Sequence, residues 1–291
     1  MITTEIHEAG LDGVFARADG DQPLRAVLAL GGSDGGVPAY WARLLAQERF
    51  ASLAVAYFNT PNTQPALTEV PLERLERALR WLREQPGVAT NDGRVGVIGV
   101  SKGAELALLL AVTFPDLVGA VVAYTPSSVV WQGIDFSTQF PPLRSSWSLG
   151  GRPLPFVPYP AGVPPTPTAQ GMSLLPIYDR GLDRVAGDAA VIPVERAVGP
   201  LLLVSGGGDR MWPAERMCRM LVDRMGANGR KRDVRHINFP DAGHVLFPYA
   251  ARGADEGDAP PMPYDLGGSP AAAQQAHAIA WPEVVRTLQG D

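Results

Sequence analysis

The feature that most constrains the fold is the pentapeptide GVSKG at residues 99–103, which lies between two apolar runs. Residues 94–98 are mostly apolar and β-branched, whereas residues 104–110 are alanine- and leucine-rich helix formers. A strand, a tight turn and a helix in this order are the context of a nucleophile elbow, in which the serine occupies a strained turn. Its two glycines let strand and helix approach without Cβ clashes. The pattern therefore predicts that Ser101 is a nucleophile above a helix N-terminus. The alternative is an ordinary glycine-rich strand–helix turn.

Composition limits the classes of protein to consider. The 291 residues are 46% hydrophobic and 19% charged, as expected for a globular enzyme with a large core. The formal net charge of −5 gives no sign of a nucleic-acid surface. The first residues lack the features of a signal peptide, and the apolar run at 106–112 is too short to cross a bilayer. The single cysteine, Cys218, excludes an intramolecular disulfide and is expected to be a core thiol. These features predict a cytoplasmic protein without membrane insertion.

Strand-like and helix-like segments alternate along most of the chain. Besides the elbow strand, strands are predicted over residues 25–30, 50–57, 118–124, 200–205 and 234–239. Besides the elbow helix, helices are predicted over residues 38–48, 71–84, 214–225 and 271–288, with Pro282 kinking or dividing the last. A Gly-, Pro- and Asp-rich stretch at 250–270 is predicted to be a surface loop. The alternation predicts an α/β fold, in which helices cover both faces of a mostly parallel sheet. In such sheets the chemistry gathers beyond the carboxyl ends of the strands.

One segment, residues 131–198, interrupts this alternation with many prolines and aromatic residues and little periodicity. A loop of this length is uncommon inside a compact domain unless it has a function, and a disordered linker should be poor in aromatics. We therefore expect a lid or cap insertion that covers Ser101, within a single domain of residues 1–291. Phe136 and Phe156 are candidate residues of the substrate pocket that this lid would form.

A serine nucleophile needs a general base, and His244 is the candidate. It follows the last predicted strand and lies beside a glycine, in a loop that could reach the carboxyl ends of the strands. His7 lies near the amino terminus on an expected edge strand, His236 within a strand and His277 on an alanine-rich helix. These three are expected to be structural. The alternative for His244 is an exposed loop histidine.

The base needs an acid that orients it, and Asp209 is the candidate. The apolar residues 201–204 lead into glycines and then into this carboxylate. The chain order Ser101, Asp209, His244 is that of the α/β-hydrolase fold, which we therefore expect. Alternatively, Asp209 caps the helix that follows. Asp241 is the rival acid, although it lies only three residues before the histidine.

An oxyanion hole needs two backbone N–H donors. The amide of Lys102, directly after the nucleophile, is one candidate, and that of Ser33 in the GGSDGG stretch at 31–36 is the other. The alternatives for this stretch are a plain glycine-rich turn and a phosphate cradle, but it lacks both the GxGxxG spacing and a Walker lysine. We assign no chemistry to the Lys102 side chain. No spacing of histidines and cysteines suggests a metal site, and no cofactor is expected.

These motifs resemble the catalytic carboxy-terminal domain of the type I acyl-CoA thioesterases and bile acid-CoA:amino acid N-acyltransferases. The resemblance covers the chain from about residue 11 onward. It rests on residues 31–36, 96–105, 192–197, 208–212 and 242–244, and on a tail with residues 267–268, 276–278 and Trp281. Residues 192–197 and the tail are not general hydrolase features, so they make the match specific. Dienelactone-hydrolase-like enzymes share the core fold that the resemblance implies.

The resemblance places the family's catalytic triad on Ser101, Asp209 and His244, and it implies a hydrolase that cleaves acyl thioesters through an acyl-serine. The transferase members carry cysteine at the position of Ser101, so the serine favours hydrolysis. Larger family members also have an amino-terminal β-sandwich domain, for which 291 residues leave no room.

Three functions stay open at this point. The first is an acyl-CoA thioesterase, and the second is a carboxylesterase or an acyl-CoA:amine N-acyltransferase on the same scaffold. The third is an inactive hydrolase that serves as a binding module. The expected partner is a small acyl thioester or ester, with no nucleic acid, and the sequence does not indicate an oligomeric state. Residues 230–232 and Arg210 could meet the phosphates of CoA, but a solvated turn is the favoured account of the former.

Overall fold

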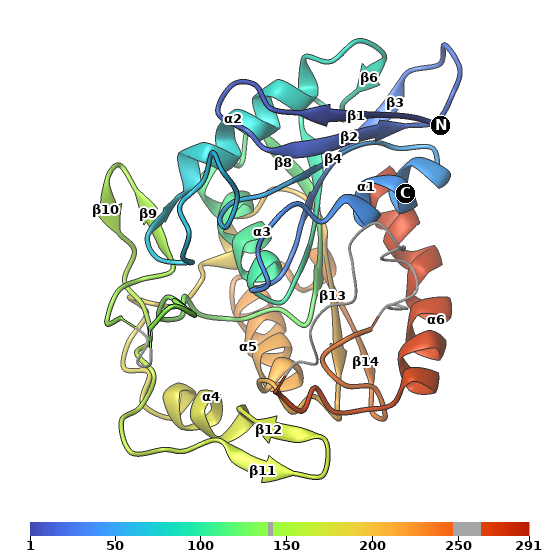
Figure 1. Ribbon diagram of the computed structural model, residues 1–291. Coiled ribbons are helices and arrows are strands. Elements are labelled where there is room, and N and C mark those ends of the chain that lie inside the picture. The colour runs from blue at the N-terminus through green and yellow to red at the C-terminus, as the bar shows by residue number, and fades with distance from the viewer. Residues whose placement is uncertain (139–141, 247–262, 291) are drawn as a thin grey trace.

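A central sheet organises the chain, of which the computed structural model describes residues 1–138, 142–246 and 263–290. In spatial order its strands are β1 (Ile2–Ile6), β2 (Gly13–Arg17), β4 (Ala51–Val55), β3 (Leu24–Leu30), β7 (Val95–Val100), β8 (Val118–Tyr124), β13 (Leu201–Gly206) and β14 (Val234–Phe239). The short strand β6 (Val88–Ala89) pairs with β3 off this path. Figure 1 shows the sheet running through the centre of the molecule.

The six strands from β4 to β14 are parallel, which confirms the predicted sheet type. The first two strands depart from it, because β1 pairs with β2, and β2 with β4, in antiparallel register. The sequence analysis expected an edge strand near His7 but did not predict this hairpin. Four of the five residues of β1 are exposed at the sheet edge, so the strand lacks the apolar run that marks its neighbours.

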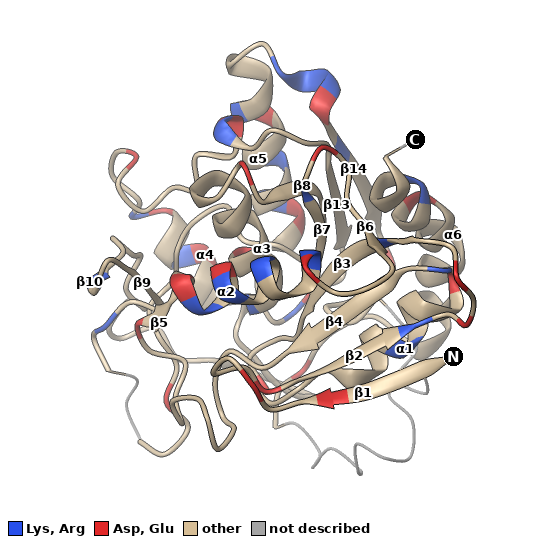
Figure 2. Ribbon diagram, turned by 90° about the horizontal axis from the view of Figure 1, so that it is seen from above, with Lys and Arg blue, Asp and Glu red and all other residues tan. Residues whose placement is uncertain are grey.

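Helices cover both faces of the sheet, as the alternation predicted. Figure 1 shows α2 (Leu72–Arg83), α3 (Lys102–Thr113) and α5 (Ala214–Ala227) on one side, and α1 (Ala39–Gln47) and α6 (Pro270–Gln289) on the other. Each side has its own apolar cluster. The helix α2 buries its leucines, whereas its charged residues are at least partly exposed, and Arg80 pairs with Glu76. Figure 2 shows these charged positions along α2. None of the described helices is long and apolar enough to cross a membrane.

The predicted strands and helices agree with the observed bounds to within three residues. The last helix continues through Pro282, so this proline does not divide it. Proline has no N–H and usually breaks a helix interior, but α6 buries one side against the sheet, and its first turn is capped by Ser269. The predicted surface loop at 250–270 lies mostly outside the described residues.

The segment 131–198 lies between β8 and β13, and the part of it that the structure describes contains only short elements. They are β9 (Trp147–Leu149), β10 (Arg152–Pro153), β11 (Thr166–Thr168), β12 (Gly171–Ser173), α4 (Leu175–Leu182) and the 3₁₀ helix η1 (Val194–Arg196). The strand β9 pairs with β10 and with β5 (Val70–Pro71). Trp131, Val157, Tyr178 and Leu182 form an apolar cluster with Trp212, Ala214 and Met217, so the segment packs against the start of α5.

Close backbone packing at the start of α3 explains the glycines of the GVSKG motif. A Cβ atom on Gly103 would lie 2.1 Å from the carbonyl oxygen of Gly31, and one on Gly99 would lie 2.2 Å from that of Gly103. Both distances are shorter than any Cβ contact, so only glycine fits. This confirms the expected approach of strand and helix, and it brings the end of β3 against the first turn of α3.

We expect Gly103→Ala to lower the free energy of unfolding by about 1–3 kcal/mol, because the new methyl group overlaps a backbone carbonyl that cannot move alone. Gly226 is the matched control: it lies in α5, and a Cβ there would meet nothing within 4 Å. Gly226→Ala should raise stability by about 0.5–1 kcal/mol. Urea unfolding measures both, and equal effects would contradict the packing argument.

Candidate active site

Ser101 lies in the turn between β7 and α3 and has the strained backbone expected of an elbow. Its φ and ψ angles are 55° and −119°, an unusual conformation for a residue with a Cβ. The side chain is partly exposed beyond the carboxyl end of β7. Lys102 is the first residue of α3, so its backbone N–H has no acceptor within the helix. The Ser101 hydroxyl and a backbone N–H without an intrahelical acceptor at the N-terminus of α3 therefore come from adjacent residues of this turn.

His244 joins Ser101 to Asp209 through two hydrogen bonds. The distance from His244 Nε2 to Ser101 Oγ is 2.9 Å, and that from His244 Nδ1 to Asp209 Oδ2 is 2.8 Å. The exposed fractions of His244 and Asp209 are only 7% and 5%. A carboxylate accepts only, so Nδ1 carries the proton and Nε2 is left to accept from the serine hydroxyl. The structure thus brings together the three residues predicted from the sequence.

The second oxygen of Asp209 fixes the carboxylate in place. Oδ1 accepts from the backbone N–H of Met211 at 2.8 Å and from that of Trp212 at 3.2 Å. The Trp212 ring also packs edge-on against the His244 ring, with centroids 5.6 Å apart. The alternative that Asp209 caps α5 is wrong, because the N-cap is Pro213, without a side-chain hydrogen bond. Asp241, the rival acid, is exposed.

The loop with Ser33 lies beside the elbow. A Cβ atom on Gly32 would lie 3.7 Å from Ser101 Cβ, and the carbonyl of Gly31 contacts Gly103. Tyr57 lies under this loop, and its hydroxyl donates to the carbonyl oxygens of Gly31 at 2.9 Å and Gly32 at 2.7 Å. The two expected oxyanion donors therefore belong to neighbouring backbone segments, one of which contains Ser101.

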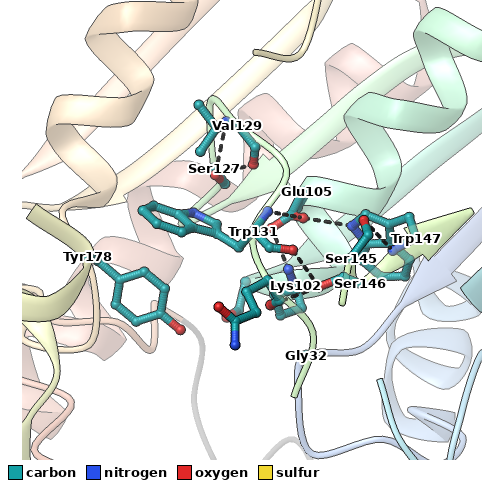
Figure 3. Close-up of polar contacts among 12 residues, drawn as sticks. Gly32, Lys102, Glu105, Ser127, Val129, Trp131, Ser145, Ser146, Trp147 and Tyr178 are labelled. Atoms are coloured by element: carbon teal, nitrogen blue, oxygen red, sulfur yellow. Dashed lines mark hydrogen bonds and ion pairs between the residues drawn. The ribbon is translucent and has the colours of Figure 1, made fainter. Parts of the chain in front are cut away.

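The Lys102 side chain points into the protein, where it forms a buried ion pair with Glu105 at 2.7 Å. Its Nζ also lies 5.3 Å from the centre of the Trp147 ring. Glu105 Oε1 accepts from Trp147 Nε1 at 2.6 Å and from the backbone N–H of Trp131 at 3.2 Å (Figure 3). Burial lowers the pKa of the Lys102 amine and raises that of the Glu105 carboxyl, while their mutual attraction opposes both shifts.

Sequence reasoning missed Glu105 and Tyr57. One signal for Glu105 was available: it is an acid in a helix whose residues 102–111 are otherwise mostly alanine and leucine and are all buried. A charge in such a helix must have partners. No comparable signal marks Tyr57, because a tyrosine after an apolar strand is ordinary core material.

The two candidate pocket residues have different surroundings. Phe136 is 66% exposed, which does not support its predicted place in an enclosed pocket. Phe156 is half-buried and lines a cavity of about 430 Å³ with Val157, Tyr159 and Val185. The aromatic and proline content of residues 131–198 predicts apolar contacts. The sequence pattern does not show which aromatic ring faces the interior of the protein.

Other candidates lie away from Ser101. His236, on β14, contacts Ser205 Oγ through Nε2 at 2.7 Å, and Cys218 is fully buried in the core, as expected. Burial lowers the pKa of His236 and raises that of the Cys218 thiol. Arg230 pairs with Asp233 and donates to the backbone carbonyl of Glu195. It lies before the start of β14, at the opposite end of the parallel strands from Ser101, which fits a structural turn. Within the described ranges, no three metal-ligating side chains cluster.

Comparisons with known proteins point to one family. The profile described as "BAAT / Acyl-CoA thioester hydrolase C terminal" matches residues 70–290. The chain is 29% identical over 238 residues to the peroxisomal succinyl-coenzyme A thioesterase of Mus musculus, covering 79% of this chain and 50% of that protein. It is 26% identical to acyl-coenzyme A amino acid N-acyltransferase 2 of Rattus norvegicus, covering 96% of this chain and 63% of that protein.

Among solved structures, a putative dienelactone hydrolase from Klebsiella pneumoniae subsp. pneumoniae MGH 78578 matches with a TM-score of 0.56 and 15% identity. The match covers 99% of this chain and 98% of that one, and it shows the α/β-hydrolase fold. The chain spans about half to two thirds of the length of the two curated relatives. The profile covers most of this sequence, and the chain therefore belongs to the family of BAAT and acyl-CoA thioester hydrolase carboxy-terminal domains.

Proposed function

We propose that this chain is a serine hydrolase that cleaves acyl-CoA thioesters, with Ser101, His244 and Asp209 as its catalytic triad. The observation that carries the proposal is the unbroken hydrogen-bonded chain from Ser101 Oγ through the His244 ring to Asp209 Oδ2. Membership of a family that contains acyl-CoA thioesterases supports the substrate class. One relative is named as peroxisomal, so the cytoplasmic location stays a prediction.

In the proposed mechanism, His244 Nε2 takes the proton of Ser101 as its Oγ attacks the thioester carbonyl carbon. Asp209 holds the imidazole orientation and stabilises the imidazolium. The tetrahedral intermediate then collapses: the carbon–sulfur bond breaks, and the thiolate leaves, taking the proton from His244. The product is acyl-Ser101. A water molecule gives a proton to His244 and attacks this ester, which releases the carboxylic acid and restores the serine.

The backbone N–H groups of Lys102 and Ser33 are the proposed oxyanion donors. The free N–H at the first position of α3 and the adjacent glycine-rich loop support this assignment. Such donors act on charge that appears only as the carbonyl becomes tetrahedral, so they lower the barrier without tightening substrate binding.

We propose that residues 131–198 form the lid and acyl-binding wall of this single domain. A series of ring contacts supports this role, because Trp212 packs on His244, Tyr178 on Trp212 and Tyr159 on Tyr178. Tyr159 and Phe156 line the apolar cavity of the segment. An acyl chain leaving Ser101 along these rings would reach apolar surface at each step.

The nucleophile is tested first. Ser101→Ala should lose turnover by roughly 10³-fold or more while it stays folded, because the acyl-enzyme can no longer form. Acyl-CoA hydrolysis, circular dichroism and mass spectrometry after fluorophosphonate treatment measure this. An adduct on another serine, or near-normal activity in the variant, would show that the nucleophile is wrong.

The acid is tested by comparing two carboxylates. Asp209→Asn should lower kcat by up to about 10⁴-fold, because the amide favours the wrong imidazole tautomer. Asp241→Asn is the matched control, since this side chain is exposed near the same loop, and its effect should be within about twofold. The reverse order would assign the role to Asp241.

The wall is tested by acyl chain length. Each buried methylene should add about 0.8 kcal/mol, or about fourfold in kcat/KM, until the cavity is full. Phe156→Ala should shift the length at which this rise stops, whereas Phe136→Ala, at an exposed position, should not. An unchanged profile in both variants would contradict the proposed wall.

The three possible functions can be distinguished by varying the substrate in the hydrolysis assay. Matched oxygen esters cleaved faster than thioesters would indicate a carboxylesterase. An amide formed in the presence of glycine or taurine would indicate transfer, the reaction named for one relative. No reaction and no fluorophosphonate label would favour a binding module.

A further inference from the structure

Tyr57 lies two residues beyond the end of β4, and its exposed fraction is 2%. Its hydroxyl is 2.7 Å from the carbonyl oxygen of Gly32 and 2.9 Å from that of Gly31. The single proton of the hydroxyl is therefore shared between the carbonyls of two successive peptide units. Burial, with smaller contributions from Asp34 and Glu105, raises the pKa of Tyr57 well above its ordinary value, so the hydroxyl keeps this proton.

Peptide geometry links this contact to the oxyanion donor. The carbonyl of Gly32 and the N–H of Ser33 belong to one planar peptide unit, and the described chain has no cis peptide bonds. In a trans unit these two groups point in opposite directions. A hydrogen bond that holds the carbonyl toward Tyr57 therefore turns the Ser33 N–H away from Tyr57.

Glycine makes such an anchor necessary. Gly31 and Gly32 have little intrinsic preference between backbone conformations, so their peptide planes can rotate at small cost unless another group holds them. Gly32 lies next to Ser101, where a rotated plane would replace a donor with a carbonyl oxygen. An acceptor at that place would repel the oxyanion instead of stabilising it.

A residue of the inserted segment, Trp147, packs against the Tyr57 ring. The two ring centroids are 5.6 Å apart, and the Trp147 indole donates to Glu105. Lys102, the residue of the other proposed donor, pairs with the same carboxylate. Both sides of the proposed oxyanion hole are thus joined to one buried group.

We propose that Tyr57 is a positioning residue, which orients the Ser33 N–H toward the oxyanion by holding the carbonyl of Gly32. The inference rests on the proposed function and adds to it a residue outside the triad. Tyr57 does not touch the substrate, since its hydroxyl is engaged below the loop.

Tyr57→Phe is the test, because it removes the hydroxyl and keeps the ring packing. We expect kcat for acyl-CoA hydrolysis to fall about 10- to 100-fold, somewhat less than the loss of a whole oxyanion donor. The KM should stay within about twofold, because the lost interaction exists only in the transition state. The loss should be equal at every acyl chain length, unlike that of a pocket variant.

Tyr124→Phe is the matched control. Tyr124 is also a fully buried tyrosine at the end of a strand, and its hydroxyl has no hydrogen-bond partner among the described residues. Its removal should leave kcat within about twofold. Circular dichroism checks the folding of both variants, and rates are taken per active site titrated with a fluorophosphonate.

The rate of Ser101 phosphonylation gives a second readout that needs no thioester substrate. The phosphoryl oxygen also gains negative charge during attack, so Tyr57→Phe should slow labelling about 10-fold or more. If wild type labels at Ser101 but cleaves no thioester, the proposed substrate class fails, and the labelling rate still tests Tyr57. An unchanged kcat and labelling rate, a rise in KM alone, or an equal loss in Tyr124→Phe would overturn the inference.

Discussion

The buried carboxylate of Glu105 is the contact on which the arrangement around Ser101 depends. It accepts from Lys102 Nζ in the first turn of α3, and from the Trp147 indole and the backbone N–H of Trp131 in the inserted segment. A charge taken out of water is costly unless its hydrogen-bonding capacity is filled, so these partners are held as a set. The first turn of α3 and the start of the inserted segment are therefore fixed relative to each other.

This network explains how a site is assembled from distant residues. Backbone packing at Gly103 sets the elbow against the end of β3, and Tyr57 holds the loop that follows β3. Trp147 contacts the ring of this tyrosine and donates a hydrogen bond to Glu105. The inserted segment therefore supports the loop after β3 and also supplies the aromatic rings of the proposed acyl-binding wall. A buried network in which both carboxylate oxygens of Glu105 have partners resists small displacements, and oxyanion donors depend on such precise placement.

Much of the fold and of the candidate site was predictable, because these features follow from local sequence patterns. The elbow, the parallel sheet and the helices could be predicted from apolar periodicity and glycine spacing, and Asp209 and His244 follow strands that end at the same edge. The hairpin of β1 and β2 was missed because β1 is mostly exposed. Contacts such as that of Glu105 with Trp147 join residues 42 positions apart, and a single sequence contains no signal for such pairs. The same limit applies to Phe136, whose exposure depends on tertiary packing.

The family profile does not distinguish a hydrolase from an acyltransferase. The identity of the nucleophile helps to decide between these two reactions. Attack by a serine converts a thioester into an oxygen ester, which is less reactive toward an amine than the thioester that a cysteine would form. Turnover of that ester then depends on a base that activates the acceptor, which is the role proposed for His244. Water is present at far higher concentration than any amine, so transfer would require a site that excludes it. As the proposed nucleophile, Ser101 therefore favours hydrolysis on chemical grounds that are independent of the relatives.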